Sequence, residues 1–374
     1  MVQAAGGVPG VVALVTDRDG LRHAGVAGVR TLGVPVPMTL DTVLSAFSLT
    51  KAITGAALMQ LVEAHRVTLD DPAGAYVPEI DAVRVLDGFD TDGTPRLRPP
   101  RRPITVRHLL LHVGGFGYPF FNHDLRRYRE ATRRNTTPDV APDPHAHIRG
   151  PLLFDPGEQW RYSISIDWVG FMVEAASGMK LDRYMKEKIF APLGMADTGF
   201  KITPAMRPRK AAVHVRKEGG GFTATDHELN QDPEVFQGGG ALYSTVGDYL
   251  KFVRALLGGG APILKPEAVA LMYRNAMNDG VLCRPLKSYI PARSADMNFV
   301  DGMKWGLTFM INPRAFPGRR SADSLTWGGL ANSYFWIDPA RKVTGVWATQ
   351  LLPFYDARAV EAFEEFERGV YGSL

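Results

Sequence analysis

The sequence has little cysteine and no long apolar run. Cys283 is its one cysteine, so no disulfide can form within the chain, and its distance from any nucleophile motif gives no reason to expect catalysis there. No apolar run reaches the roughly 18 residues of a membrane-spanning helix. The first 15 residues lack a basic start and are interrupted by Pro9 and Gly10, which predicts a loop entering a strand rather than a signal peptide. We therefore expect a cytoplasmic protein without a membrane partner.

The sequence also lacks a strong excess of charge. Its 43 basic and 39 acidic residues give a net charge of +4, which does not indicate nucleic-acid binding. The one basic cluster, residues 126–134, has no interleaved run of aromatic residues and predicts a solvated helix face. Hydrophobic residues make up 45% of the chain, as in an ordinary globular protein. Bulk composition thus predicts a globular protein with no nucleic-acid partner, and it leaves the oligomeric state open.

Three patterns resemble metal sites, but each lacks part of the ligand set. His108 and His112 are four residues apart, yet no HExxH glutamate accompanies them, and the leucines between them favour a core helix. His145 and His147 lie in a proline-rich stretch without an obvious third ligand. Residues 90–93 resemble the start of a calcium loop, but no glutamate follows at its twelfth position, so we expect a turn. We expect neither a metal nor a cofactor.

Strand patterns gather at the two ends of the sequence, and helical patterns lie between them. Residues 11–16 and 23–29 predict a hairpin around a turn at 17–20, and residues 165–178 predict one of the middle helices. The C-terminal part predicts strands at 305–313, 324–329, 333–339 and 342–352, followed by an amphipathic helix at 356–371. Both chain ends are therefore expected to share one antiparallel sheet.

The predicted fold class is α/β in the α+β sense, an antiparallel sheet flanked by helices beside a mostly helical second lobe. A chain of 374 residues exceeds one ordinary core, which also favours two lobes. We predict an α/β domain from residues 1–70 and 215–374 and a mostly helical domain from residues 71–214. A site at the seam between the lobes is the natural place for chemistry.

Ser48 and Lys51 form an S-x-x-K motif at the predicted start of a helix. A serine hydroxyl needs a base within reach, and positions three residues apart share one helix face. The free N–H groups and the dipole at a helix start favour developing negative charge. Ser177 and Lys180 match the same pattern, but Gly178 predicts that they stand at a helix end, where the dipole is unfavourable. We therefore choose Ser48 as the nucleophile and interpret Ser177 as structural.

Two further segments hold candidate site residues. Tyr162 precedes the helix at 165–178 and could carry a proton if it lies near Ser48, although a packed tyrosine is the plainer interpretation. Trp327, Gly328 and Gly329 lie on a predicted strand, where two glycines indicate either a bulge or the close approach of a ligand or backbone. The N–H of Leu330, just after them, is a candidate second oxyanion donor beside that of Ser48. No G-x-S-x-G occurs, which argues against an α/β-hydrolase nucleophile elbow.

These motifs in this order resemble the serine β-lactamase and penicillin-binding-protein superfamily. The resemblance covers nearly the whole chain and is closest to the class C-like branch, which includes family VIII carboxylesterases and statin side-chain acyltransferases. It implies an acylated Ser48, an activating Lys51 and a general base and acid in Tyr162. The segments that carry it are VPGVVALVTDRDG, SLTKAITGAALMQLVEAHRVTLDDP, ITVRHLLLHVGGFGY, FDPGEQWRYSISIDWVG, IFAPLGMADTGF, QGGGALYSTVGDYLKFVRALL and WATQLLPF.

Departures from the lactamase pattern bear on the substrate. Ile164 stands where the lactamase Y-x-N has its asparagine, and Trp327 stands where K-T-G has its lysine. Loss of that amide and that cation disfavours anionic lactams and favours neutral, apolar acyl groups. Lys342 begins a K-V-T-G segment with one residue inserted, which we do not count as K-T-G. Residues 112–115 also depart from the family's usual H-T-S-G, with no effect that we can derive.

We therefore predict a serine carboxylesterase that forms an acyl-enzyme on Ser48 from a small-molecule ester or thioester. The first alternative is an acyltransferase that passes the acyl group to a small acceptor, with an acceptor pocket formed by Tyr118, Phe120, Phe121 and Trp160. A weak β-lactamase is a further alternative. A catalytically silent binding protein is the alternative from another class, and the intact serine, lysine and tyrosine set argues against it.

Overall fold

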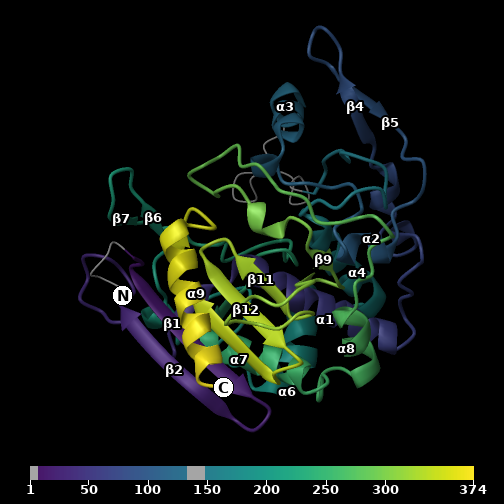
Figure 1. The fold of residues 1–374 in the computed structure, drawn as a ribbon. Coiled ribbons are helices and arrows are strands. Elements are labelled where there is room, and N and C mark those ends of the chain that lie inside the picture. Colours follow the sequence, from purple (N-terminus) through teal and green to yellow (C-terminus); the bar gives the residue numbers. More distant parts are fainter. Residues whose placement is uncertain (1–6, 133–147) are drawn as a thin grey trace.

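The centre of the molecule is a seven-stranded antiparallel sheet built from both ends of the chain. The structure is a computed structural model that describes residues 7–132 and 148–374. The order of strands across the sheet is β2, β1, β13, β12, β11, β10 and β9 (Figure 1). Their bounds are β1 Gly10–Asp17, β2 Leu21–Gly28, β9 Lys304–Trp305, β10 Met310–Ile311, β11 Leu325–Gly329, β12 Ser333–Asp338 and β13 Val343–Ala348. The predicted fold class is thus confirmed, because the N-terminal hairpin pairs through β1 with the C-terminal strand β13.

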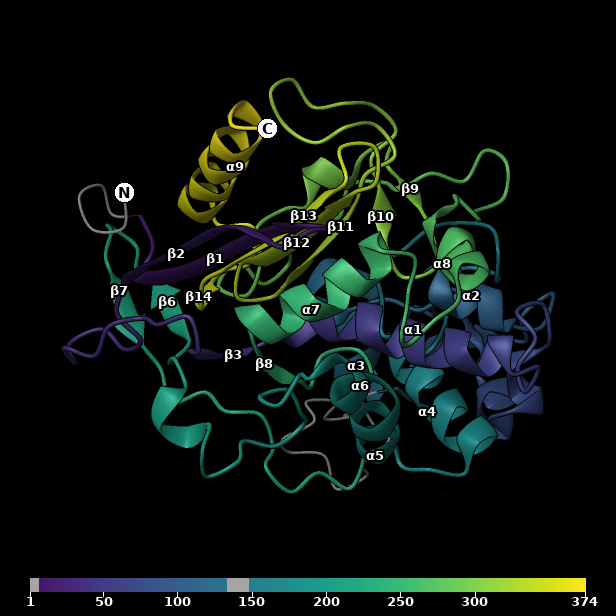
Figure 2. The same ribbon diagram turned by 90° about the horizontal axis from the view of Figure 1, so that it is seen from below.

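Helices cover both faces of this sheet, which explains why its central strands are apolar throughout. Every residue of β11, β12 and β13 is buried. The C-terminal helix α9 (Ala357–Gly372) crosses one face, and α7 (Val246–Leu257) lies against the other (Figure 2). The Asp356 side chain accepts the Ala359 N–H at 3.0 Å and so caps the start of α9.

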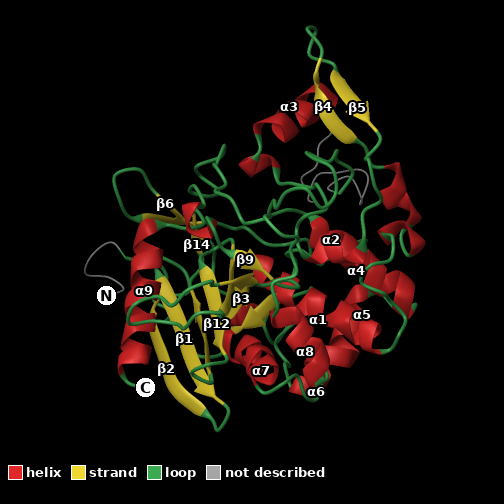
Figure 3. Ribbon diagram, turned by 45° about the vertical axis from the view of Figure 1, so that its right-hand side comes forward, coloured by secondary structure: helices red, strands yellow, loops and turns green. Residues whose placement is uncertain are grey.

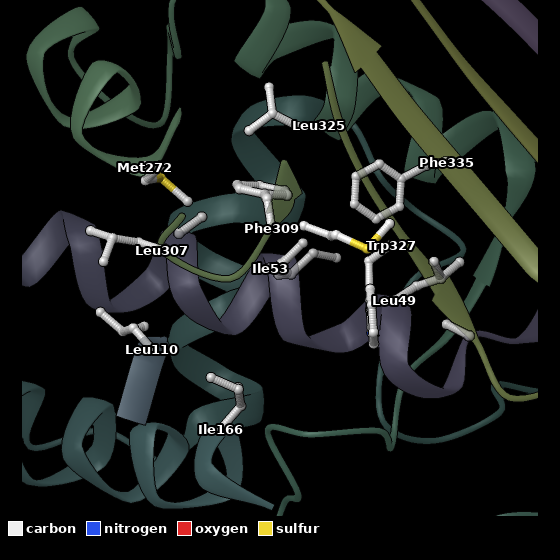
Figure 4. Close-up of a cluster of buried hydrophobic side chains, with 14 of the residues drawn as sticks. Leu49, Ile53, Leu110, Ile166, Met272, Leu307, Phe309, Leu325, Trp327 and Phe335 are labelled. Carbon is white, nitrogen blue, oxygen red and sulfur yellow. The ribbon is translucent and has the colours of Figure 1, made fainter. Parts of the chain in front are cut away.

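A second, helical region lies beside the sheet on the α7 side (Figure 3). Helix α1 (Thr50–Glu63) is buried along most of its length between this region and the sheet. Leu49, Ile53, Trp327 and Phe335 meet in the apolar cluster on its sheet side (Figure 4). The remaining helices are α2 Val106–Leu110, α3 His123–Thr132, α4 Ser165–Ser177, α5 Leu181–Met185, α6 Ala191–Leu193 and α8 Pro266–Tyr273. The predicted domain boundaries themselves remain a prediction.

The structure also contains small sheets that the sequence patterns did not reveal. Strands β3 (Val43–Ser45) and β8 (Tyr243–Thr245) pair immediately before helices α1 and α7. A hairpin of β4 (Val85–Phe89) and β5 (Pro95–Arg98) stands in the region expected to be helices and loops, and residues 90–93 form its predicted turn. The third small sheet contains β14 (Leu351–Leu352), β6 (His214–Arg216) and β7 (Phe222–Ala224).

Two predicted strands and one helix start are corrected. The strand expected at 305–313 is broken into β9 and β10 around Thr308, whose φ is +75°. The strand expected at 342–352 ends at Ala348, and its last two residues join the separate sheet of β14. The helix expected from Ser48 begins as the 3₁₀ turn η1 (Phe47–Leu49), and its α-helical part starts at Thr50. The hydrophobic pattern alone does not reveal where a strand is interrupted or where a helix starts with a 3₁₀ turn.

Among residues 7–132 and 148–374, no helix has the length and apolar character needed to cross a bilayer. The proline-rich stretch with His145 and His147 lies outside the described residues, as do the last two residues of the basic cluster.

Candidate active site

Ser48 lies in a tight turn between strand β3 and helix α1. The preceding residue, Phe47, has a φ of +46°, an uncommon conformation for a residue with a side chain. The turn is fixed from both sides, because the Ala46 N–H donates to the Leu242 carbonyl at 2.8 Å and the Leu49 N–H donates to the Ala46 carbonyl at 3.1 Å. Ser48 itself is half-buried. The fold thus presents the hydroxyl at the N-terminal end of a buried helix, where negative charge is favoured.

Lys51 is the buried centre of the polar contacts around Ser48. It is 1% exposed, and its Nζ lies 3.3 Å from Ser48 Oγ, 3.0 Å from the Tyr118 hydroxyl and 2.6 Å from the Gly239 carbonyl oxygen. Three acceptors match the three N–H donors of an ammonium group. The i,i+3 spacing therefore brings the lysine to the serine, and residues from two other parts of the chain complete its hydrogen bonds.

Electrostatics around Lys51 favour its charged form. Burial acts to lower the pKa of the Lys51 ammonium, whereas Tyr118 and Tyr162 in their anionic forms and the carboxylate of Asp167 act to raise it, and the net shift is upward from the ordinary value for lysine. Burial also raises the pKa of Tyr118, in spite of the adjacent Lys51. At neutral pH the pair therefore consists of an ammonium group on Lys51 and a neutral phenol on Tyr118.

Asp167 reaches Lys51 indirectly, through the turn at residues 238–240. Its side chain, 5% exposed in the first turn of α4, accepts the Gly239 N–H at 2.8 Å, while the carbonyl of the same residue accepts from Lys51. A Cβ at Gly239 would lie 2.8 Å from a carboxylate oxygen of Asp167. Thr54 on α1 anchors the same turn by donating to the Gly238 carbonyl at 2.7 Å. The turn thus holds the lysine through backbone groups, and a side chain at Gly239 would displace the Asp167 carboxylate.

Tyr162 lies across the site and is tied to the sheet through Trp327. The indole N–H of Trp327 donates to the Tyr162 hydroxyl oxygen at 3.1 Å, and the two rings are 4.6 Å apart between centroids. Lys51 Nζ lies 4.9 Å from the centre of the Tyr162 ring. The tyrosine oxygen therefore acts as an acceptor toward the strand, with the ammonium beside its ring.

The glycines of strand β11 permit close packing against the nucleophile turn. A Cβ at Gly329 would lie 2.5 Å from the Ala46 carbonyl oxygen, and one at Gly328 would lie 3.0 Å from the Tyr334 ring. The pairing of β11 with β12 is regular, so the glycines serve close approach rather than a bulge. Leu330 follows in the turn between these strands.

A cavity of about 380 Å³ opens onto Ser48 and collects most of the predicted site residues. Lys51, Gly329 and Trp160 are buried and do not line it. His227, which is exposed, stacks on Phe47 at 5.8 Å between ring centroids. The lining includes Ser48, Tyr118, Phe120, Phe121, Tyr162, Ile164, Trp327, Gly328 and Leu330. The predicted acceptor pocket therefore belongs to this cavity, except for Trp160.

His108, His112 and Cys283 lie outside the reacting centre. His112 is 1% exposed, and its Nδ1 lies 3.0 Å from the Ser163 hydroxyl, next to Tyr162 in the chain. Burial, aided by the charge of Lys51, holds the pKa of His112 well below the usual range, so this ring is neutral. The Thr105 N–H donates to His108 Nδ1 at 3.2 Å, which completes a capping box. Burial raises the pKa of the Cys283 thiol, which disfavours a reactive thiolate.

Sequence patterns did not single out three residues of this region. Asp167 appeared as one acid in the first turn of a helix, and Gly239 as one glycine in a run of three. Arg129 appeared as part of a solvated helix face, yet the structure places it on the cavity wall. Because each acts through a contact distant in sequence, the only available signals were an acid beside the Tyr162 motif and a glycine run.

Similarity to known proteins agrees with this geometry. The family model described as Beta-lactamase matches residues 1–368. The chain belongs to the beta-lactamase family. The resemblance to the serine β-lactamase and penicillin-binding-protein superfamily is thus confirmed, together with its statin-type acyltransferase branch.

Relatives of this beta-lactamase-family protein include both transferases and an esterase. Monacolin J acid methylbutanoyltransferase of Aspergillus terreus is 31% identical, over 97% of this chain and 92% of the relative. Lovastatin esterase of Penicillium rubens is also 31% identical, over 98% of this chain and 95% of the relative. The solved structure of simvastatin synthase (LovD) from Aspergillus terreus is 29% identical with a TM-score of 0.87, over 98% of this chain and 94% of that one. The protein is an enzyme of the serine carboxylesterase or acyltransferase type.

Proposed function

We propose that the protein is a serine carboxylesterase in which Ser48 carries the acyl group of a small, apolar ester. The observation that supports this most is the contact of Ser48 Oγ with the ammonium of Lys51 at 3.3 Å, beneath a cavity walled mainly by aromatic and aliphatic side chains. A nucleophile beside a fixed charge in a partly apolar cavity suits acyl transfer through a covalent intermediate.

In the first half of the proposed reaction, Tyr162 acts in its phenolate form, and Ser48 Oγ attacks the ester carbonyl as its proton passes to the Tyr162 oxygen. That oxygen already accepts the Trp327 N–H, and the Lys51 ammonium beside the ring balances the negative charge that the phenolate carries before it takes the proton. The N–H groups of Ser48 and Leu330 hold the oxyanion. The carbon–oxygen bond to the alcohol then breaks, the alcohol takes the proton from Tyr162, and the acyl group remains on Ser48.

In the second half, a water molecule gives its proton to Tyr162 and attacks the acyl carbonyl. The second tetrahedral intermediate breaks at the Ser48 Oγ bond, the serine regains its proton from Tyr162, and the free acid leaves. The sequence of steps is symmetric, so the same residues serve each half. No net change occurs in the protein.

Substrate preference follows from the residues beside the reacting centre. Ile164 and Trp327 line the cavity where lactamases use an asparagine amide and a lysine ammonium. Their apolar surfaces favour an acyl chain that carries no polar group near the carbonyl. We propose short or medium acyl groups, of which the methylbutanoyl group named for one relative is an example.

Acyl transfer is the second candidate, supported by the transferase names of several relatives and by the size of the cavity. A bound hydroxyl, amine or other small acceptor would take the place of water in the second half. The aromatic wall of Tyr118, Phe120 and Phe121 offers a surface on which such an acceptor could lie. The chemistry at Ser48 is unchanged in this alternative.

Intact-protein mass spectrometry during turnover tests both candidates. Mixing the enzyme with p-nitrophenyl methylbutanoate should add one acyl group to Ser48, and the adduct should decay with release of free acid. A panel of small alcohols and amines would show transfer as new ester or amide products at the expense of free acid. An enzyme that hydrolyses the ester without any adduct at Ser48 would contradict the proposal.

A further inference from the structure

Two arginine side chains line the cavity although the proposed reaction does not use them. Arg129 extends from helix α3, and Arg293 lies in the loop that follows Ile290. Each residue contributes to the same cavity wall as Phe120 and Phe121. Arg129 is half-buried whereas Arg293 is exposed, and the charge of Arg293 acts on Arg129, which makes the charge of Arg129 the one that needs an explanation.

Arg129 has no ion-pair or hydrogen-bond partner among the residues that the structure describes. It is half-buried, and its burial together with the charge of Arg293 lowers its pKa to about 10. The group therefore remains a cation at neutral pH. A buried polar group normally finds a partner, and here the cavity is the space in which an anionic partner would lie.

Contacts among three segments fix the position of both arginines. Arg126, one turn before Arg129 on α3, donates to the Tyr289 carbonyl at 2.9 Å. The Tyr289 N–H donates in turn to the Phe120 carbonyl at 2.8 Å. The Arg293 carbonyl accepts the Phe354 N–H at 3.0 Å. The backbone that carries the two guanidinium groups is therefore tied to the cavity wall.

An aromatic path connects the arginines to the reacting centre. The Arg293 guanidinium lies 5.4 Å from the centre of the Phe120 ring, which stacks on the Tyr118 ring at 5.0 Å. The Tyr118 hydroxyl contacts Lys51. Two aromatic rings thus separate Arg293 from the lysine, which suits a substrate with an apolar body and a charged end.

We propose that Arg129 and Arg293 form an anion-binding subsite, which holds a carboxylate or phosphate of the substrate while its acyl carbonyl lies at Ser48. This inference rests on the proposed function and adds to it a substrate class: esters with an apolar middle and one anionic end. Guanidinium groups bind such oxyanions through charge-assisted, often bidentate hydrogen bonds.

Two carboxylates also line the cavity, and neither neutralises Arg129. Asp167 faces the Lys51 end and accepts from Gly239, whereas Glu234 is exposed. Neither forms an ion pair with Arg129 in the described part of the chain.

The anion can belong either to the acyl chain or to the alcohol, and matched esters distinguish the two sources. For the acyl side, mono-p-nitrophenyl suberate is compared with the neutral p-nitrophenyl octanoate. For the alcohol side, p-carboxyphenyl butanoate is compared with its neutral isostere p-carbamoylphenyl butanoate. The measured quantity is the ratio of kcat/KM for the anionic ester over its neutral partner.

We expect wild-type enzyme to prefer the anionic ester in one of the two arms. Arg129→Gln should lower that ratio by roughly 10- to 100-fold, the range for loss of a hydrogen bond to a charged group. Arg293→Gln should lower it too, which keeps the test valid if the first variant folds poorly. Arg127→Gln is the matched control. Arg127 lies on the same helix as Arg129, but its guanidinium carbon lies 4.0 Å from the centre of the Phe89 ring and the residue does not line the cavity.

Three results would overturn the inference. They are a wild-type preference for the neutral ester in both arms, an unchanged ratio in both arginine variants, or an equal loss in Arg127→Gln, which would indicate general attraction of anions. Each can occur while hydrolysis still depends on Ser48, so failure of this inference differs from failure of the proposed function.

Discussion

Two segments of the chain carry the same S-x-x-K spacing and have different surroundings. Ser48 and Lys51 lie at the start of a helix, with the lysine buried and its Nζ 3.3 Å from the serine hydroxyl. Ser177 is the last residue of α4, and its hydroxyl accepts the Met179 N–H at 3.1 Å. Lys180 is 66% exposed in its side chain and pairs with Glu174 at 3.8 Å. The second serine caps a turn, and the second lysine is an ordinary surface cation.

The comparison shows what a short motif needs before it can act chemically. Spacing alone allows reach, but only the first segment directs its lysine back over the serine. At Ser48 the free N–H groups of a helix start favour an oxyanion, whereas the carbonyl groups at the end of α4 oppose one. Gly178, with a φ of +72°, ends α4 and turns the chain away before Lys180. Helix direction and burial separate the two motifs.

Removing each serine hydroxyl should give the largest difference between the two segments. Ser48→Ala is expected to lower kcat/KM for p-nitrophenyl butanoate by at least about 10³-fold, since the nucleophile is lost. Ser177→Ala is the matched control and should stay within about twofold of wild type, because its hydroxyl serves only the local turn. Equal activity of the two variants would remove Ser48 from the mechanism.

Replacing each lysine with methionine should give the next largest difference. Lys51→Met keeps the length of the side chain and removes the charge, and we expect a loss of roughly 10²- to 10⁴-fold in kcat. Its melting temperature is also expected to fall, because the Gly239 carbonyl and the Tyr118 hydroxyl lose their buried partner. Lys180→Met should change neither quantity. Wild-type activity in a folded Lys51→Met variant would remove the charge of Lys51 from the mechanism.

The contrast between these motifs also marks what sequence could predict. The pairing of both chain ends in one sheet followed from alternating apolar residues, and the special position of Ser48 followed from its place before a helix. The positive φ of Phe47 had no signal, because nothing in a phenylalanine favours that conformation. The contact of Asp167 with Gly239 joins parts of the chain 72 residues apart, and no local pattern encodes it.

Basic residues give a second example of this limit. A run of arginines on a helix predicts a solvated face, and Arg127 stays exposed as that pattern requires. Arg129 nevertheless turns to the cavity, because the loop around Tyr289 packs against α3 and covers one side of the helix. Loop packing of this kind depends on the whole fold and has no periodicity in the sequence.

The two tyrosines near Lys51 provide the third test, since the Ser177 segment has no counterpart to either of them. Tyr162→Phe should lower kcat by about 10²-fold or more, because it removes the proposed proton carrier. Tyr118→Phe removes one hydrogen bond to Lys51 and should cost about tenfold. Because Tyr118 is the closer hydroxyl to the lysine, the reverse order of losses would transfer the proton-carrying role from Tyr162 to Tyr118.

The smallest expected effect concerns the carboxylate that supports Lys51 through the backbone, and it appears in the pH profile. Asp167 is one of the groups that raise the pKa of Lys51. Asp167→Asn keeps an oxygen that can accept the Gly239 N–H but removes the negative charge, so the ammonium is less stabilised and the pKa of Lys51 falls. Because the proposed reaction needs the charged lysine, activity should be lost at a lower pH on the basic side than in wild type, with only a small change near neutrality. Glu174→Gln, beside Lys180, is the control and should leave the profile in place. A basic limb that stays fixed in Asp167→Asn would show that the carboxylate holds the turn without acting on the charge of the lysine.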